Sequence, residues 1–242
     1  MLKTKPLCAA LCALLSLTFG LSQFLVPNFR GYDPSQFPVP QADPLVVPEG
    51  YAFAIWGPIY LWLVVGMAWA LLRRSDDAQW HAMRMPLIVS LAVGTLWLPV
   101  ASVSPVWATV LIGLMFVSTL AALFRAPVGD AWFGALPVGL YAGWLSAATS
   151  VSVALLASGY GVLSDVTAAL VFTACAAVVG FVVQWRLGRA PTYGFGVIWA
   201  LVAIAIGASG RSDILSAIAI VGAGLVAVPT FNAVRSALVR AG

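Results

Sequence analysis

The sequence predicts an all-α integral membrane protein that forms a bundle of about eight transmembrane helices. Of its 242 residues, 62% are hydrophobic and only 8% are charged, and the mean hydropathy is +1.01. A soluble domain carries roughly 25% charged residues, so this composition cannot supply the surface of a soluble protein. The apolar residues also come in blocks close to the 20 residues that cross the hydrocarbon layer.

Eight apolar blocks approach or exceed the roughly 17 to 25 residues needed for one crossing. They are residues 6–25, 52–72, 85–101, 106–124, 133–157, 162–184, 194–208 and 214–232. The blocks at 85–101 and 194–208 are short. The second of these is expected to cross the membrane, with a re-entrant segment as the alternative. No linker long enough to separate two domains interrupts the blocks, so residues 1–242 are expected to form a single membrane domain.

The positive charges predict the orientation of the bundle, because Lys and Arg gather in cytoplasmic loops. With eight spans and a cytoplasmic N-terminus, ten basic residues lie inside and two lie outside. The inner ten are Lys3, Lys5, Arg73, Arg74, Arg84, Arg125, Arg186, Arg189, Arg235 and Arg240, and the outer two are Arg30 and Arg211. The split requires an even number of spans, so it supports eight helices independently of hydropathy. We therefore expect a multi-pass protein of the cell membrane with both termini cytoplasmic.

The first block has an alternative interpretation as a cleaved signal peptide, since Lys3 and Lys5 precede its apolar run. The run is longer than the apolar part of a usual signal peptide, and no clear Ala-x-Ala cleavage site follows it. We expect a first transmembrane helix here. Cleavage would instead leave seven helices.

One sizeable loop, residues 26–50, is predicted on the outer side. It contains six prolines, which stiffen the chain and prevent a helix. They are Pro27, Pro34, Pro38, Pro40, Pro44 and Pro48. Two interpretations stay open: a plain connector, and a stiff cap over the mouth of the bundle. At the predicted outer start of the sixth helix, Asp165 follows Ser164 and is expected to act as a helix N-cap.

The second block carries aromatic residues inside the membrane rather than only at its edges. Phe53, Trp56 and Tyr60 share one side of a helix by their spacing. At 1.5 Å per residue, Trp56 and Tyr60 lie roughly 8 and 13 Å below the outer boundary, too deep for an interfacial belt. Other tryptophans fall at or beyond block ends and are expected in the headgroup zone. These are Trp80, Trp107, Trp132 and Trp185.

The fifth block combines aromatic and small residues on adjacent sides. Tyr141 and Trp144 lie near its middle, and Ala148 and Ser152 follow on the same side. An adjacent side carries a ladder of small residues that lets another helix approach closely. The ladder is Gly139, Gly143 and Ala147. This pattern is typical of a helix that lines a tight cavity and equally of an ordinary packed helix, and the ladder is a candidate surface for homo-oligomerisation.

The sequence offers few residues for catalysis or metal binding. Cys8, Cys12 and Cys175 lie in apolar blocks, and the one histidine, His81, lies in a polar segment. These are too few and too scattered for a metal site or a Ser-His-Asp set. The chain has no basic run of five or more residues, so its net charge of +4 does not indicate nucleic-acid binding. We expect no enzyme activity, no metal, no cofactor and no nucleic-acid partner.

The second and fifth blocks resemble the TspO/MBR family of tryptophan-rich sensory proteins. The resemblance rests on a proline-rich loop after the first block and on two sets of residues. At the head of the second block these are Pro48, Tyr51, Phe53, Trp56, Ile59 and Tyr60, followed by "GMA" at 66–68, and in the fifth block they are Leu136, Pro137, Trp144 and Ala148. It covers residues 6–157 as five helices, to which residues 158–242 would add three.

Members of that family bind tetrapyrroles and other flat hydrophobic molecules beneath the loop after the first helix. The resemblance implies a similar site beneath residues 26–50, where aromatic rings would stack on a flat ligand. The residues that it implies are Tyr51, Phe53, Trp56, Tyr60, Trp97, Tyr141 and Trp144. A ligand-binding protein of sensory type is therefore the leading hypothesis. A small-molecule transporter or permease subunit is the alternative, because eight helices can build an alternating-access path.

Overall fold

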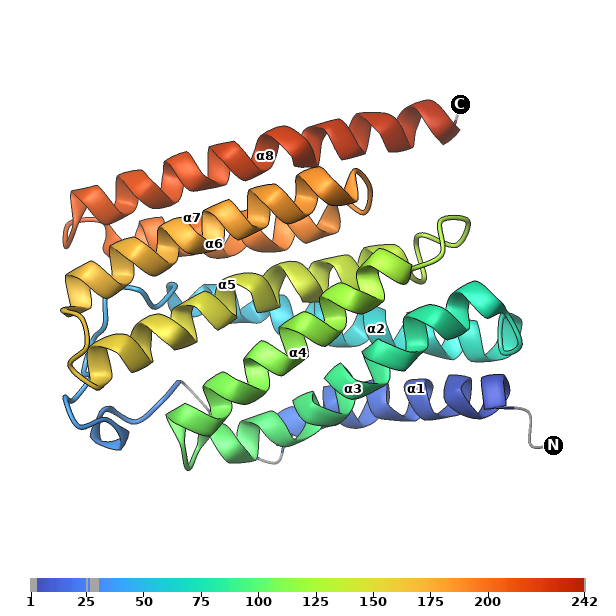
Figure 1. Ribbon diagram of the computed structural model, residues 1–242, viewed down its shortest axis with the longest axis horizontal. Helices are drawn as coiled ribbons and strands as arrows, with labels where there is room; N and C mark the ends of the chain where they lie inside the picture. Colours follow the sequence, from blue (N-terminus) through green and yellow to red (C-terminus); the bar gives the residue numbers. More distant parts are fainter. Residues whose placement is uncertain (1–3, 25, 27–30, 242) are drawn as a thin grey trace.

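The computed structural model describes residues 4–24, 26 and 31–241, which form a bundle of α-helices (Figure 1). Within these ranges there are eight, which confirms the predicted fold class. They are α1 (Thr4–Leu21), α2 (Trp56–Arg73), α3 (Ala78–Ala101), α4 (Pro105–Arg125), α5 (Ala135–Gly159), α6 (Asp165–Leu187), α7 (Thr192–Ala208) and α8 (Asp213–Ala241). The predictions made on Lys3, Pro27 and Arg30, and on the side chain of Arg240, fall outside the described residues.

Seven of these helices are long and apolar enough to cross a membrane. The eighth, α7, is apolar but has only 17 residues, at the lower limit for one crossing. A 3₁₀ segment, Gly50–Ile55, leads directly into α2 and lengthens that span to Gly50–Arg73. The chain is therefore a multi-pass membrane protein whose immediate partner is the lipid bilayer.

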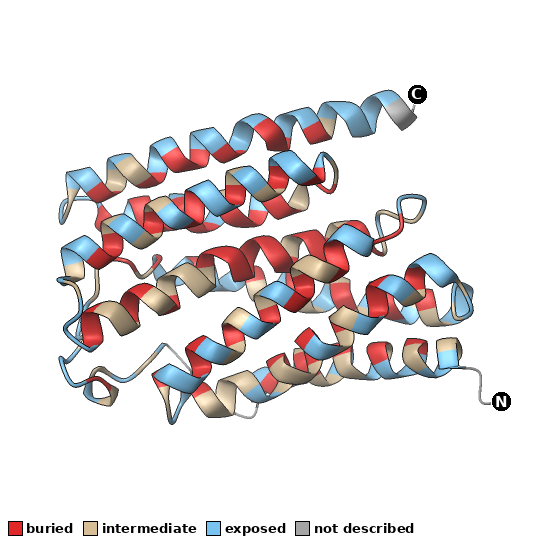
Figure 2. Ribbon diagram, viewed as in Figure 1, coloured by how far each residue is buried: buried red, intermediate tan, exposed pale blue. Residues whose placement is uncertain are grey.

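The first five helices close into a ring. α1 packs against α2 and α3, α3 packs against α4, α4 packs against α5, and α2 closes the ring on α5. The last three helices pack on the other side of α5, where α6 and α7 contact it directly and α8 covers both of them (Figure 1). Because α5 is shared by both groups, 56% of its most apolar window is buried, against at most 39% for the other long helices (Figure 2).

The small-residue ladder of α5 packs against α7 of the same chain. A Cβ at Gly143 would overlap the backbone carbonyl of Tyr193, and a Cβ at Gly139 would lie 2.6 Å from Oγ1 of Thr192. Ala147 is also buried. The predicted close approach of a helix is therefore correct, but the predicted role in homo-oligomerisation is wrong, because α7 already fills this face.

Polar caps set where the helices begin. The Asp77 carboxylate accepts hydrogen bonds from the backbone N–H groups of Gln79 and Trp80, so α3 begins seven residues before the apolar block at 85–101. Hydropathy alone missed this start because the first turns of α3 are polar. At α6 the N-cap is Ser164, whose hydroxyl accepts from the backbone N–H of Thr167. The predicted capping role of Asp165 is therefore wrong.

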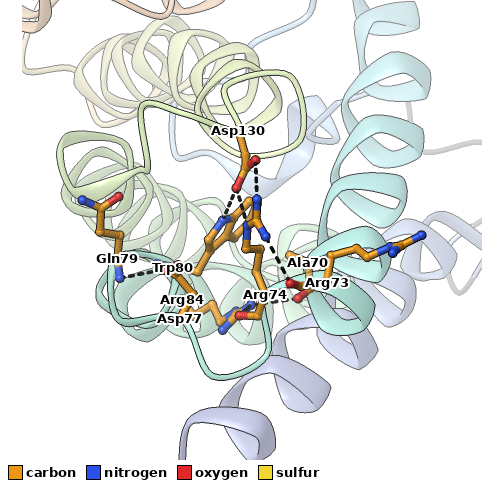
Figure 3. Close-up of polar contacts among 8 residues, drawn as sticks. All are labelled: Ala70, Arg73, Arg74, Asp77, Gln79, Trp80, Arg84 and Asp130. Atoms are coloured by element: carbon orange, nitrogen blue, oxygen red, sulfur yellow. Dashed lines mark hydrogen bonds and ion pairs between the residues drawn. The ribbon is translucent and has the colours of Figure 1, made fainter.

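A polar cluster ties the α2–α3 turn to the loop before α5, at the end of the bundle that carries both termini (Figure 1). The Asp130 carboxylate accepts two hydrogen bonds from the Arg74 guanidinium, at 2.8 and 3.2 Å, and a third from the Trp80 indole at 3.0 Å (Figure 3). The hydrogen bonds and the Arg74 charge lower the pKa of Asp130. Trp80 is buried in this cluster, whereas Trp107, Trp132 and Trp185 are each at least 60% exposed, and the place of all four in the headgroup zone stays a prediction.

Arg84, in the second turn of α3, makes further hydrogen bonds at the same end of the bundle. Its side chain is almost fully buried and donates to the backbone carbonyls of Ala70 and Arg74, at the end of α2 (Figure 3). It also donates to the carbonyl of Ser75 in the following turn. A cation at a helix C-terminus is favoured by the helix dipole and satisfies carbonyls that have no partner within the helix. Arg84 therefore has a structural role in joining α2 to α3.

Candidate functional site

A cavity of about 310 Å³ lies beneath the proline-rich loop, at the end of the bundle opposite the termini. Its walls come from the loop, from the start of α2, and from α3, α4, α5 and α7. The described lining residues are Gly31, Tyr32, Pro34, Phe37, Gln41, Ala42, Asp43, Pro44, Val47, Pro48, Phe53, Trp56, Trp97, Ile112, Trp144, Ala147, Ala148, Val151, Ser152, Leu155 and Ala200. Most of them are apolar, which is typical of a small-molecule pocket.

The loop that covers the cavity is ordered by local hydrogen bonds and by two buried side chains. The Asp33 carboxylate accepts from the backbone N–H and the hydroxyl of Ser35, and these bonds lower the pKa of Asp33. They cap the 3₁₀ turn Pro34–Gln36. Phe37 and Val46 are buried among residues of α5, α6, α7 and α8 at the end of the bundle opposite the termini. The loop therefore has its own anchors in the helical bundle.

Further contacts fasten the loop along its length, mostly to the last four helices. The backbone N–H groups of Val39, Leu45 and Glu49 donate to the Gly159 carbonyl (2.8 Å), the Asp165 carboxylate (3.2 Å) and the Ala203 carbonyl (3.2 Å), respectively. Arg211, between α7 and α8, donates to the Asp43 carbonyl and forms an ion pair with its carboxylate at 2.9 Å. The helices that the resemblance left outside its five-helix part thus provide the seat for this loop.

One face of α5 forms the inner wall of the cavity. Trp144, Ala148, Val151, Ser152 and Leu155 all line it, and their spacing of three and four residues puts them on one side of the helix. Ala148 and Ser152 are the residues that the sequence placed on the side of Trp144. The small size of Ala148 leaves open the space that a larger side chain would fill.

Four of the seven residues implied by the resemblance meet at the cavity: Phe53, Trp56, Trp97 and Trp144. The Trp144 ring makes edge-to-face contacts with Phe53 and Trp56, at centroid distances of 5.9 and 6.1 Å. Trp97, on α3, is fixed by α4, because its indole N–H donates to the Ala108 carbonyl at 3.0 Å. Aromatic rings from three different helix segments thus surround one apolar space.

The other three residues lie away from the lining. The Tyr51 ring packs edge-to-face against Trp199 of α7, with 46% of the residue exposed. Tyr60 stacks on Trp56 at 5.2 Å and packs against Phe19 of α1. Tyr141 is fully buried below the cavity, and its hydroxyl lies within hydrogen-bonding distance of the Ser90 hydroxyl, at 3.0 Å. Tyr60 thus supports Trp56 from behind, and neither Tyr51 nor Tyr141 reaches the cavity surface.

The polar groups of the cavity are few. Burial raises the pKa of the Tyr32 hydroxyl, an effect opposed by the neighbouring hydroxyls of Ser152 and Thr109. Trp144 is only 3% exposed, and its indole N–H has no hydrogen-bond partner among the described residues. Asp43, on the loop, is the one charged residue among the described lining residues. The described lining can therefore offer ring surfaces and hydrogen bonds, and its one charge is negative.

Sequence reasoning missed the loop's own contribution to the site. Tyr32 and Phe37 line the cavity together with several loop prolines, yet a loop has no periodicity that predicts which side chains point inward. Ala200 was missed because it belongs to α7, beyond the range of the resemblance. No group of three or more His, Cys, Asp or Glu side chains that could hold a metal occurs in the described parts of the chain.

A second hollow lies on the outer surface of α2. Pro58, Leu61, Trp62, Val65 and Trp132 line it, and it is more open than the cavity beneath the loop. The Trp62 indole N–H donates to the Trp132 carbonyl at 2.8 Å. Because all of its lining is apolar and it faces outward from the bundle, this hollow is ordinary lipid-facing surface with no polar group to orient a ligand.

Comparison with known protein families matches residues 36–231 to a family described as TSPO-like protein. Neither the curated proteins nor the solved structures gave a match. The family match begins in the loop after α1 and ends within α8, so it covers well over half of the chain. It includes α6 and α7 as well as the helices that carry the aromatic residues, so the division at residue 157 stays a prediction. The protein is therefore a member of the TSPO-like family, as the aromatic residues of its second and fifth apolar blocks predicted.

Proposed function

We propose that this membrane protein binds a flat, hydrophobic small molecule in the cavity beneath its loop and acts as a receptor of the tryptophan-rich sensory type. The observation that carries the proposal is the meeting of Phe53, Trp56, Trp97 and Trp144 around one loop-covered apolar space. Aromatic rings favour offset or edge-to-face contact with another flat ring system. A tetrapyrrole is the ligand class that the family resemblance implies.

Binding is favoured over transport by the position of the cavity. Carriers hold their substrate near the middle of the bilayer, with a path that opens alternately to each side. Here the cavity lies at one end of the bundle and its cover is fastened to several helices. We propose no catalytic role, since the lining offers one exposed carboxylate and a few hydroxyl groups but no nucleophile paired with a base.

We further propose that the protein resides in the cell membrane with both termini in the cytoplasm. Both termini lie at the same end of the bundle (Figure 1), which also carries most of the described arginines. The loop and its cavity then face the outside. A cysteine that replaces Arg186 should react only with reagents that reach the cytoplasmic side. Labelling of that cysteine from the outside alone would show that the protein has the opposite orientation.

The binding proposal is tested by filling the cavity. Protein in lipid nanodiscs is titrated with a flat apolar probe, and quenching of tryptophan fluorescence is measured against empty nanodiscs. Replacing Ala148 with Phe should abolish saturable quenching, whereas replacing the exposed Ala10 of α1 with Phe should leave it unchanged. Equal saturable binding in both variants would refute this site. Faster uptake of the probe into sealed vesicles that contain the protein than into protein-free vesicles would favour a transport function instead.

A further inference from the structure

Charged residues are unevenly distributed at the end of the bundle that carries the termini. Around α1, α2 and α3, basic and acidic residues occur together, and the Asp130 carboxylate is bonded to Arg74. At the same end, α4, α6, α8 and the α6–α7 turn carry only basic residues among those that the structure describes. These four, here called the arginine patch, are Arg125, Arg186, Arg189 and Arg235. The positive charge of the patch is therefore not balanced by a neighbouring acid within the described chain.

One member of the patch joins the end of α6 to the end of α4. The Arg189 guanidinium, in the α6–α7 turn, donates to the backbone carbonyls of Leu123, Phe124 and Ala126 at 2.9 to 3.1 Å. These carbonyls flank Arg125 and lie at the C-terminus of α4, where a cation is favoured. Arg189 therefore has a structural role, and it also brings a second positive charge next to that of Arg125.

The packing of α8 on α6 places a further arginine close to the same level. Both helices begin at the end opposite the termini and run in the same direction (Figure 1). A Cβ at Gly222 of α8 would lie 2.7 Å from the Cβ of Ala177 of α6, so these two positions are side by side. Arg186 follows Ala177 by nine residues and Arg235 follows Gly222 by thirteen. Arg235 therefore lies about one helical turn beyond Arg186 along the bundle.

The depth of Arg186 matches that of a lipid headgroup. At 1.5 Å per residue, the helix from Asp165 to Arg186 is about 32 Å long, close to the roughly 30 Å of the hydrocarbon layer. The neighbouring Trp185 is 60% exposed and stacks on Phe181 at 5.7 Å, as is typical of aromatic residues at a membrane boundary. With Asp165 at one boundary of the hydrocarbon layer, Arg186 thus lies at the other, beside the lipid phosphates.

The patch has hydrogen-bond donors to spare. Arg186 and Arg235 are exposed, and neither bonds to another residue in the described part of the chain. Arg125 is also exposed and donates to the Ala121 carbonyl of its own helix. A guanidinium carries five N–H donors in a planar fork that matches the oxygens of a phosphate. A zwitterionic lipid balances its phosphate with its own cation, whereas an anionic lipid leaves that charge for the protein to neutralise.

From the unbalanced charge, the depth of Arg186 and the free guanidinium groups, we propose that the arginine patch binds the headgroups of anionic phospholipids such as phosphatidylglycerol. The lipid belongs to the leaflet that surrounds the end of the bundle with the termini. This site is separate from the cavity beneath the loop, which lies at the opposite end.

Two lipids that differ only in their headgroups test the proposal. Detergent-solubilised protein is titrated with phosphatidylglycerol or phosphatidylcholine of identical acyl chains, and the bound lipids are counted by native mass spectrometry. Phosphatidylglycerol should bind at least fivefold more tightly, since about 1 kcal/mol is typical for one basic residue near an anionic headgroup. The double variant Arg186→Gln and Arg235→Gln should bring this ratio towards one. The double variant Arg186→Lys and Arg235→Lys keeps both charges and should retain the preference.

Arg73→Gln is the matched control. Arg73 is an exposed arginine at the same end of the bundle, but it is followed by Asp76 and Asp77 in the α2–α3 turn, so its loss should change the ratio little. An equal fall in Arg73→Gln and in the double glutamine variant would mean that lipids respond to the total charge and not to the patch. A wild type without a preference, or a preference that survives in the double glutamine variant, also overturns the proposal.

Discussion

The carboxylate of Asp165, at the start of α6, accepts a hydrogen bond at 3.2 Å from the backbone N–H of Leu45, in the loop that covers the cavity. The two residues are 120 positions apart in the sequence. With the Arg211–Asp43 ion pair and the buried side chains of Phe37 and Val46, this contact fastens the loop to the last helices at the end of the bundle opposite the termini. The last three helices therefore contribute to the site by fixing its cover.

Replacing Asp165 with Ala is expected to speed ligand release. The variant loses one anchor of the loop, so the cover opens more often, and the dissociation rate should rise by about two- to tenfold with association little changed. Stopped-flow quenching of the cavity tryptophans measures both rates. Asp213→Ala, at the start of α8, is the control, because no side-chain hydrogen bond or ion pair joins Asp213 to the described residues of the loop. If the dissociation rate is the same in Asp165→Ala and wild type, the loop is a connector and not a lid.

Truncating the rings of Trp56 and Trp144 should weaken ligand binding. Each Trp→Ala variant removes a ring from the cavity wall, and the expected loss is about 1–3 kcal/mol of binding free energy if the ring contacts the ligand. Tyr51→Ala serves as the comparison, since Tyr51 packs on Trp199 and not on the cavity. Titration of each variant after its helicity has been verified gives the affinities. Unchanged affinity in both tryptophan variants would show that Trp56 and Trp144 do not form the binding site.

The contact between α5 and α7 should be sensitive to a single methyl group. Gly143→Ala would push a Cβ into the Tyr193 carbonyl, and such overpacking typically costs about 1–3 kcal/mol of unfolding free energy. Gly113→Ala, in the middle of α4, meets open space and should be neutral or stabilising by up to about 1 kcal/mol. Denaturation curves for the two variants provide the comparison. Similar stabilities would show that α5 and α7 are not packed this closely.

The Asp130 cluster should make stability depend on pH in one direction. Its folded-state pKa lies below the ordinary value of 3.8, so the stabilising contribution is present above that value and is lost as the pH falls through the lowered pKa. At about pH 7, Asp130→Asn should lower the unfolding free energy by about 1 kcal/mol, a modest figure because Arg74 is partly exposed.

Below the lowered pKa of Asp130, the wild type and the Asn variant should become equally stable. Asp76→Asn, an exposed acid in the α2–α3 turn, is the matched control and should have little effect at either pH. Denaturation at both pH values measures the differences. A deficit in Asp130→Asn that stays constant with pH would mean that the charge of Asp130 does not stabilise this end of the bundle.

Hydropathy and charge predicted the helical bundle because both act within single segments. The chief error was the start of α3, where the cap at Asp77 and two polar turns precede the apolar residues. The glycine ladder of α5 predicted a close helix contact but not its partner, since nothing in the pattern tells α7 from a second copy of the chain. The spacing of small residues along one helix shows which side of that helix is closely packed. Which helix packs there follows only from the tertiary fold.

The site was predicted in part for the same reason. Trp56 and Trp144 are deep aromatic residues on helices, where depth and face follow from position in the sequence. Tyr141 shares that spacing but lies below the cavity, against Ser90 of α3. Helical periodicity does not predict that the cavity ends between Trp144 and Tyr141. Tyr32 and Phe37 lie in a loop whose path is set by contacts with helices distant in the sequence. No local sequence pattern therefore predicted that these two side chains line the cavity.

The most direct test of the account is to map where a ligand attaches. A flat apolar probe that carries a photoreactive diazirine group is irradiated with the protein in nanodiscs, and the modified residues are identified by mass spectrometry. We expect adducts within residues 31–48 of the loop and residues 144–155 of α5, and we expect an excess of the same probe without the diazirine to prevent them. Adducts confined to the hollow of Pro58, Trp62 and Trp132, or adducts that the excess probe does not reduce, would contradict a binding site beneath the loop.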